Sequence, residues 1–590
     1  MSAVRQVRQV RQVRQVRLST ACGAIAWAAF AWAAALHAQG AEGSFGETVD
    51  VQLVNVEVWV TDRQGNAVSG LNLDDFLVFE DGQPVFVSYF DEVTGVGVPD
   101  LTPAELAEPA PPADEDARVA PGYLVLYFDE LFSTPAGRRQ LITDLRTFLE
   151  GQLLAPERVL VLRQDSGLTV EVPLGSSRAE LDAGLDRLAR QPSTRGAQTW
   201  ADERSALRNL QGEWERLTVL GGANPNQDPC VFFANFAFNE IQQHVSLTRS
   251  RISETLAHLT DTASFLAGLP GLKTVIYTSD GLTTRPGGNL LNFVRAICPG
   301  EPVTRRLDIQ DGMSDVFREL TRHANANRVT IYTVQSLGLG QGTTLSTAAE
   351  KGVSNTFQAV GQYNAETRVQ EREGLTFLAR ETGGRAVVDQ NRFRGELEQI
   401  AQEMSSYYSL AYTPPHGGDG LEHLIEVKVR RDGLRVRHRP GYRDKSADER
   451  MLEHLESALV LNQMSNPLDV RLGAGEIKTG GSRKYVVPLL VVVPADRITF
   501  LPRKRAEVAK LKVQVMAKNE RDGRTTFTEK IYDVERPPAG SQSLSLVLSL
   551  DLDEGVHVVA FGVRDEATQE ASFVATGLDL RSPSEASAGG

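Results

Sequence analysis

Two apolar segments of this chain run directly into an aspartate, and a carboxylate at such a junction can bind a metal ion or a loop amide. The first segment, YLVLYFDELFST (123–134), places Asp129 after the apolar run and Ser133 just before the start of a helix. The second, LKTVIYTSDG (272–281), has Asp280 near its end. Carboxylate and hydroxyl oxygens suit a hard cation such as Mg²⁺, and a hydroxyl before a helix is also a common N-cap. Both interpretations are open at this level.

Both aspartates lie in residues 122–405, where strand-like and helix-like patterns alternate. The apolar runs are continuous, as in strands that are buried on both faces of a sheet. Repeated strand–helix units predict a parallel sheet with helices on both faces. The expected strands are residues 123–128, 158–164, 167–173, 272–281, 328–335 and 385–388. One expected helix begins at Pro135, and three others cover residues 178–191, 246–269 and 374–384.

Three long segments interrupt this alternation, at residues 200–243, 282–326 and 337–372. They follow the C-terminal ends of strands or nearby turns, which is the ligand-binding face of an open α/β sheet. The segments either contribute to a ligand site there or are insertions that bind nothing.

Short β segments flank the α/β region. Residues 48–92 show period-two alternation and an Asp81-Gly82 turn, and residues 407–443 contain a second hairpin turn at Asp432-Gly433. We expect these two segments to complete one small β unit into which the α/β domain is inserted. Further strands recur after residue 467 at the spacing of a β-sandwich.

The expected fold class is therefore α/β: a Rossmann-like domain inserted in or flanked by a small β-sandwich, followed by a C-terminal β-sandwich. The expected divisions are a signal peptide at 1–38, an N-terminal β unit at 46–93, a linker at 94–121, the α/β domain at 122–405, completing strands at 406–443, a helical bridge at 444–466, the C-terminal β-sandwich at 467–580 and a tail at 581–590.

The first 38 residues have the pattern of a secretory signal. Five arginines in VRQVRQVRQVRQVR precede a 19-residue apolar run, and a small residue, Ala38, follows. We expect cleavage and a secreted or periplasmic protein; the alternative is an uncleaved anchor, because 19 apolar residues just span a bilayer. Cleavage would remove Cys22 and leave Cys230 and Cys298, which predict a disulfide between two of the insertions, or else two separate buried thiols.

Composition and motifs limit the function classes. The 590 residues are 41% hydrophobic and 23% charged, with a net charge of −14, which argues against nucleic acid as a partner. The nine histidines are scattered, without an H-E-x-x-H motif or a close pair. No G-x-S-x-G element surrounds Ser166, and the GGANPNQDP segment lacks the P-loop lysine. We therefore do not expect an enzyme.

Several segments together resemble the von Willebrand factor type A (VWFA) domain: YLVLYFDELFS, KTVIYTSDG, RVTIYTV and LARETGGRAVV. The flanking segments VEVWVTDRQGNAVSGLNLDDFLVFEDGQPVFVSYF and YYSLAYTPP…IEVKVRRDGLRVRHRPGYR look like those of acidobacterial VWFA-related secreted proteins. The resemblance covers roughly residues 48–443. It implies a Rossmann-like fold and a role in adhesion, interaction or scaffolding.

The resemblance also implies a metal-ion-dependent adhesion site, made by D-x-S-x-S, a threonine on a second loop and an aspartate after the fourth strand. Asp129 and Ser133 match the first motif, Thr199 is the matching threonine and Asp280 the last aspartate. Leu131 replaces the middle serine and offers no oxygen, so the site is degenerate. Mg²⁺ or Mn²⁺ is the expected ion, with a partner's carboxylate completing its coordination. In the metal-free alternative, a hydroxyl caps the helix and the aspartates bind loop amides.

Three functions remain. The first is a secreted protein that binds a protein or peptide through the strand-end face of the α/β domain. The second is a metal-free scaffold protein of the cell envelope, and the third, less favoured, is a hydrolase acting from the insertions. A membrane would be a partner only if the N-terminal segment stays uncleaved.

Overall fold

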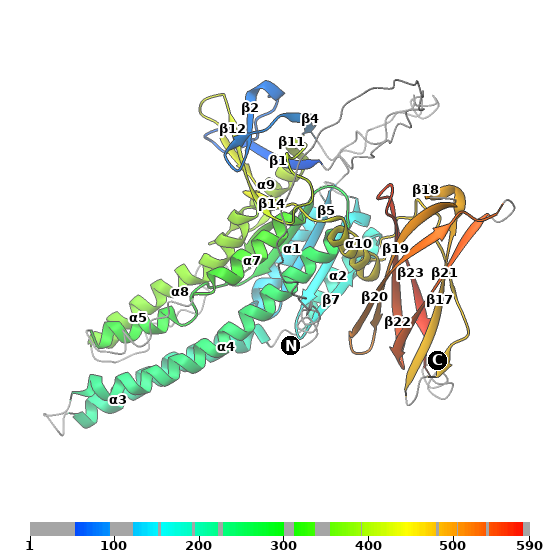
Figure 1. Cartoon of the computed structure of the whole chain (residues 1–590). Helices are drawn as coiled ribbons and strands as arrows, with labels where there is room; N and C mark the ends of the chain where they lie inside the picture. Colours follow the sequence, from blue (N-terminus) through cyan, green and yellow to red (C-terminus); the bar gives the residue numbers. More distant parts are fainter. Residues whose placement is uncertain are drawn as a thin grey trace, which may run out of the picture. The chain divides into compact units, whose positions relative to one another are not determined.

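The computed structural model describes eleven stretches of the chain: residues 53–94, 122–150, 155–191, 195–221, 228–299, 312–336, 354–390, 392–479, 483–503, 506–538 and 542–581. The expected signal segment, residues 95–121 of the expected linker and residues 582–590 of the expected tail lie outside them. The chain divides into two compact units, one spanning Val51–Ser465 and the other containing Asn466–Gly590 (Figure 1).

The centre of the first unit is a six-stranded sheet in the order β10-β9-β8-β5-β6-β7. Neighbouring strands are parallel except for β7, which pairs antiparallel with β6 as the short hairpin partner. Its strands are β5 (Tyr123–Asp129), β6 (Val159–Gln164), β7 (Leu168–Val172), β8 (Lys273–Ser279), β9 (Val329–Gln335) and β10 (Ala386–Val387). The mixed α/β architecture expected from the sequence is present.

Side chains of the sheet alternate between two hydrophobic cores, as strand geometry requires. On one face, Val125 and Tyr127 of β5 pack with apolar residues of α4, α7 and α8. On the other face, Leu124 and Leu126 pack with α1, α2 and α9. The covering helices are α1 (Pro135–Glu150), α2 (Arg178–Arg190), α4 (Pro229–Leu266), α7 (Ser314–Ala326), α8 (Ser354–Glu381) and α9 (Arg394–Ser405).

Two helices are much longer than the sequence pattern predicts. The helix expected at 246–269 is α4, which begins at Pro229, where Asp228 caps the helix and proline occupies its first position. The helix expected at 374–384 is the end of α8, and the predicted glycine cap is Gly383, whose φ of 77° favours glycine. The early halves of both helices pack away from the sheet, so their apolar residues face a different core.

This third core belongs to a helical extension that α3 (Arg195–Gly221) and α5 (Gly288–Ile297) form with the early halves of α4 and α8 (Figure 1). Its buried residues include Leu210, Phe233, Leu290 and Tyr363, one from each of the four helices. The insertions that the sequence shows at 200–243 and 337–372 are therefore, over their described residues, largely helix.

A small β-sandwich completes the first unit. Its two four-stranded sheets, β13-β1-β11-β4 and β14-β12-β2-β3, share one apolar core. Strands from both sides of the α/β region pair directly, because β1 lies antiparallel to β11 and β2 lies antiparallel to β12. The strands are β1 (Val54–Thr61), β2 (Phe76–Glu80), β3 (Gln83–Pro84), β4 (Val87–Thr94), β11 (Ser406–Tyr412), β12 (Glu422–Val429), β13 (Arg435–His438) and β14 (Gly441–Arg443). Helix α10 (Ala447–Leu461) follows.

The second unit is built from two further antiparallel sheets around one core. Strict alternation in SLSLVLSLDLD gives β21 one buried and one exposed face. The strands are β15 (Arg471–Ala474), β16 (Lys478–Thr479), β17 (Lys484–Pro494), β18 (Leu501–Arg503), β19 (Ala506–Asn519), β20 (Thr525–Glu535), β21 (Ser543–Asp553), β22 (Val556–Asp565) and β23 (Ala571–Asp579). Among the described residues of both units, no helix is long and apolar enough to span a membrane.

Candidate functional site

The two aspartates highlighted by the sequence lie at adjacent strand ends. Asp129 is the last residue of β5, and Asp280 directly follows β8. The two strands are parallel neighbours, with Phe128 opposite Thr278, so both carboxylates are placed at the carboxyl edge of the sheet. This edge is where open α/β sheets bind ligands.

A short loop, residues 130–134, connects the predicted site residues. Asp129 Oδ1 accepts the amide of Leu131 at 2.8 Å, and Asp280 Oδ2 accepts the amide of Thr134 at 2.6 Å. The Thr199 hydroxyl, near the start of α3, donates to the Leu131 carbonyl at 2.8 Å. Ser133 is part of the same loop. The four predicted residues therefore meet at this loop. Ser133 belongs to it, Asp280 and Thr199 contact it, and Asp129 ends the strand that leads into it.

Close approach of α3 to the loop depends on a glycine. A Cβ added at Gly196 would lie 2.0 Å from the carbonyl oxygen of Ser133, well inside van der Waals contact. The start of α3, which carries Thr199, can therefore reach the loop only because residue 196 has no side chain.

Burial controls the charge of both aspartates. Their side chains are almost fully buried, each about 1% exposed. Burial raises the pKa of Asp129 to about 7, although hydrogen bonds from Tyr277 and from loop amides act to lower it. Burial likewise raises the pKa of Asp280 to about 6, against hydrogen bonds from Ser336 and Thr134. A cation or a proton near these carboxylates would therefore be stabilised.

The oxygen set for a metal ion is incomplete at this loop. The Leu131 side chain, at the position of the middle serine, is fully buried in the apolar core. Glu130, the nearest substitute carboxylate, forms a buried ion pair with Arg138. Two buried hydroxyls remain near the carboxylates: Ser133 Oγ, which has no hydrogen-bond partner in the described part of the chain, and that of Thr134, which lies against Asp280. An oxygen able to bind an ion is thus present at Ser133, whereas residue 131 offers none.

The same contacts bear on the metal-free alternative. Neither the Ser133 nor the Thr134 hydroxyl caps α1 within the described residues. Instead, the carboxylates of Asp129 and Asp280 accept the loop amides, as that alternative proposed for them. The loop is therefore held in place by two buried carboxylates.

Beside the loop lies a small cavity of about 30 Å³. Phe132, Trp200 and Leu282 supply apolar lining, and Glu203 and His244 supply polar lining. A cavity of this volume holds a few water molecules, whereas sites for small-molecule ligands are usually roughly ten times larger. Among the described residues, a ligand much larger than water would therefore contact the surface of this face rather than this cavity.

A polar cluster connects the cavity to the helical extension. Glu203 of α3 accepts hydrogen bonds from Asn289 of α5 and, at 2.8 Å, from the Tyr363 hydroxyl of α8. Asn289 also donates to Thr367 at 2.9 Å. These bonds fix three helices of the extension relative to one another.

The extension is also covalently linked. Cys230, at the start of α4, forms a disulfide with Cys298, at the end of α5. The sequence predicted this pairing between two insertions, and the structure places the two cysteines at bonding distance.

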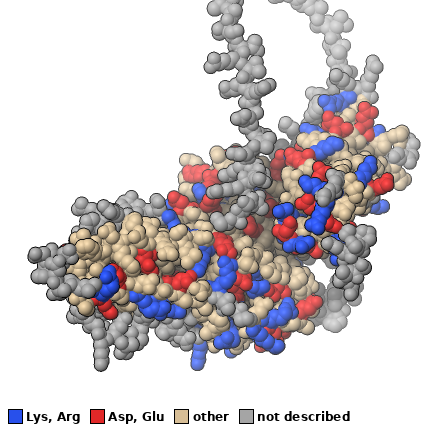
Figure 2. Space-filling model, turned by 90° about the horizontal axis from the view of Figure 1, so that it is seen from below, with Lys and Arg blue, Asp and Glu red and all other residues tan. Residues whose placement is uncertain are grey.

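Charged and apolar side chains are both exposed on the protein. Figure 2 shows acidic and basic side chains interspersed over the visible face. On the extension, the apolar side chains of Val219, Val231 and Phe232 are 78%, 49% and 50% exposed. Exposed apolar side chains of this kind occur at protein-binding surfaces.

A second group of polar residues was missed by sequence reasoning. Although the histidines are scattered along the chain, His416 and His423 stack with ring centroids 3.8 Å apart, next to Glu80. The expectation that the chain has no close histidine pair holds for spacing along the sequence but is wrong for the folded protein, in which these two rings are in contact. The turn at Asp81-Gly82 was recognised, but nothing in the sequence connects it with residues more than 330 positions later.

Comparisons with known proteins add little. No family model matches the chain, and no curated protein matches it. Two solved structures show a weak likeness. One is an X-ray structure of a Northeast Structural Genomics Consortium target, with 15% identity, 20% of this chain and 88% of that chain covered, and a TM-score of 0.14. The other is the manganese-loaded TRAP protein of Plasmodium vivax, with 9% sequence identity and a TM-score of 0.19; the match covers 70% of this chain and 93% of that chain. Neither TM-score supports an argument, so the functional inference rests on the chain itself.

Proposed function

We propose that this chain is a secreted or periplasmic VWFA-related protein that binds a protein or peptide through the carboxyl edge of its six-stranded sheet. The observation that carries the proposal is the convergence of Asp129, Ser133, Thr199 and Asp280 on one loop at that edge. The sequence resemblance and the strand order, with its antiparallel β7, support the same family.

Binding is favoured over catalysis by the shape of the face. The cavity beside the loop has room only for water-sized groups, while the extension adds a broad surface with exposed apolar side chains. A surface of this kind suits a macromolecular ligand. The disulfide and the apolar N-terminal segment in the sequence support an oxidising, extracytoplasmic location.

We further propose that the loop is a degenerate metal-ion-dependent adhesion site. Asp129, Ser133, Thr199 and Asp280 would hold Mg²⁺ or Mn²⁺ weakly, because Leu131 supplies no oxygen. Thermal stabilisation by Mg²⁺ that is lost in Asp129→Ala would support the metal. No response to Mg²⁺ would favour the metal-free scaffold, in which the aspartates only hold the loop.

The binding role is tested by affinity capture from an extract of the source cells, with and without chelator. Ala197 is exposed on the first turn of α3, two positions before Thr199. Ala197→Arg should place a long charged side chain over the face and abolish capture of the specific partner. Thr525→Arg, at a position in the other unit that is also exposed, is the matched control and should leave capture unchanged. Equal capture by both variants would contradict the proposal.

A further inference from the structure

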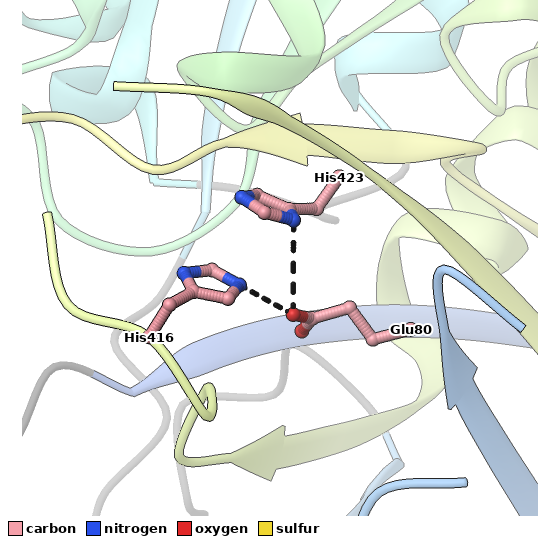
Figure 3. Close-up of side chains that lie close together, drawn as sticks. All are labelled: Glu80, His416 and His423. Carbon is pink, nitrogen blue, oxygen red and sulfur yellow. Dashed lines mark hydrogen bonds and ion pairs between the residues drawn. The ribbon is translucent and has the colours of Figure 1, made fainter. Parts of the chain in front are cut away.

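Three potential metal ligands meet in the small β-sandwich, far from the strand-end loop. Glu80 is the last residue of β2, and His423 lies in β12, the strand paired with β2. His416 lies in the connection between β11 and β12. Figure 3 shows both imidazole rings turned toward the carboxylate of Glu80.

The distances are close to those of a coordination site. Glu80 Oε1 lies 2.6 Å from His416 Nε2 and 3.9 Å from His423 Nδ1. A tetrahedral zinc ion with bonds of about 2.1 Å separates its ligand atoms by about 3.4 Å, which falls between these two distances. Sub-ångström side-chain shifts would therefore admit an ion.

The outward-facing nitrogen of each ring has a carboxylate partner. His416 Nδ1 lies 3.2 Å from Asp444 Oδ2, and His423 Nε2 lies 3.3 Å from Asp419 Oδ1. Carboxylates in this position fix the tautomer and orientation of metal-binding histidines, because they accept the proton of the nitrogen that does not bind the metal. This arrangement turns His416 Nε2 toward Glu80 Oε1, at 2.6 Å, and His423 Nδ1 toward Asp81 Oδ2, at 2.8 Å. An ion beside Glu80 would replace these two contacts with bonds from the same two nitrogens.

The excess of negative charge around the two imidazoles also favours a bound cation. Four carboxylates, from Glu80, Asp81, Asp419 and Asp444, surround two imidazoles, and their ion pairs within the described chain are with those imidazoles. Asp444 is fully buried, and its Oδ1 has no hydrogen-bond partner among the described residues. Protonating both histidines would stack two positive rings 3.8 Å apart. A divalent ion offers compensation without that repulsion.

We propose that Glu80, His416 and His423 bind one divalent transition-metal ion, with zinc as the best fit. Imidazole and carboxylate ligands suit Zn²⁺ rather than Mg²⁺. Water or Asp81 fills the remaining position. The side chain of Asp81 is about half exposed, at 52%, and marks the side from which the ion enters.

The site joins the two chain segments that flank the α/β domain. Glu80 comes before that domain in sequence, whereas both histidines come after it, 336 or more positions later. An ion held by all three fastens β2 to the β11–β12 connection and stabilises the fold that contains them. At zinc concentrations 100-fold above the Kd, the ratio of folded to unfolded protein should rise about 100-fold.

The test uses the full-length protein without a histidine tag, stripped with a chelator and titrated with ZnCl₂ by calorimetry. We expect one zinc ion per chain and a rise in Tm. Both should be lost in His416→Ala and in Glu80→Gln. His258→Ala is the matched control. The side chain of His258 is as exposed as that of His416, but its ion pair within the described chain is with a single carboxylate, that of Asp261, at 3.7 Å. This variant should bind like the wild type.

A measurement on the wild type keeps the proposal testable if a variant fails to fold. Co²⁺ bound by two imidazoles and a carboxylate in a four-coordinate site gives strong visible absorption bands, which added Zn²⁺ should abolish. Absence of these bands, or zinc binding that survives in folded His416→Ala, would overturn the proposal. The site is independent of the strand-end face, so neither result bears on the proposed binding function.

Discussion

The buried carboxylate of Asp129 should make the stability of the first unit depend on pH. Its folded-state pKa is about 7, whereas the usual value is 3.8. Between these two pH values the folded protein keeps a proton that the unfolded chain has released, so the free energy of unfolding falls as pH rises from about 4 to 7. At 1.36 kcal/mol per pKa unit, the loss attributable to Asp129 is about 4 kcal/mol.

Asp129→Asn removes this titration. An asparagine can still accept from the Tyr277 hydroxyl, but its amide would then face the Leu131 N–H that the carboxylate accepts. We expect the variant to be less stable than the wild type at pH 4.5 by about 1–3 kcal/mol, the cost of an unpaired buried group. The difference should shrink or reverse above pH 7, where the wild type has lost its advantage.

Urea unfolding followed by tryptophan fluorescence measures this difference. Trp59, Trp200 and Trp214 all lie in the first unit, and the sequence from residue 466 onward contains no tryptophan, so the signal reports the relevant unit. Asp280, with a pKa of about 6, acts in the same direction in both proteins, and its effect cancels in the comparison. Parallel stability curves for wild type and variant between pH 4.5 and 7 would refute the reasoning.

Two further predictions concern the helices beside the loop. Gly196→Ala should move α3 away from Ser133 and weaken partner binding at least tenfold, as measured by equilibrium titration. Gly212→Ala, in the same helix, meets no atom within 4 Å and should instead stabilise the protein by about 0.5–1 kcal/mol. Equal behaviour of the two variants would contradict the role of the close approach. Replacing Cys230 and Cys298 by serine opens a link across 68 positions and should destabilise the extension by about 4 kcal/mol, seen as faster hydrogen exchange in α3 and α5; unchanged exchange would show that the helices hold without the bridge.

Sequence patterns predicted the strands of the central sheet because buried parallel strands are short, apolar and bounded by turns. The same logic placed Asp129 and Asp280 at strand ends, and adjacent parallel strands bring such ends together. Leu131 could be recognised as a missing ligand from its chemistry alone. Its role in the apolar core is visible only in the structure.

The long helices were harder to delimit for a physical reason. The first half of α4 packs Phe233 and Ile241 into the extension, while the second half packs Ile252 and Leu256 against the sheet. A periodic pattern that changes its partner along one helix does not show where that helix begins.

The cluster at Glu80 was beyond local sequence reasoning altogether. Its members come together through the pairing of β2 with β12, in which Ile425 lies opposite Glu80. Pairing between distant strands is set by the whole fold, so spacing rules for metal motifs within a short segment do not apply to His416 and His423.

Site-specific photo-crosslinking tests the proposed binding face most directly. A photoreactive amino acid at Gln198, exposed on the first turn of α3, should form an adduct with one specific protein in the source cells. The same group at Thr525 in the other unit should form none. An adduct from position 525 alone, or no specific adduct from position 198, would contradict the claim that the carboxyl edge of the sheet is the binding surface.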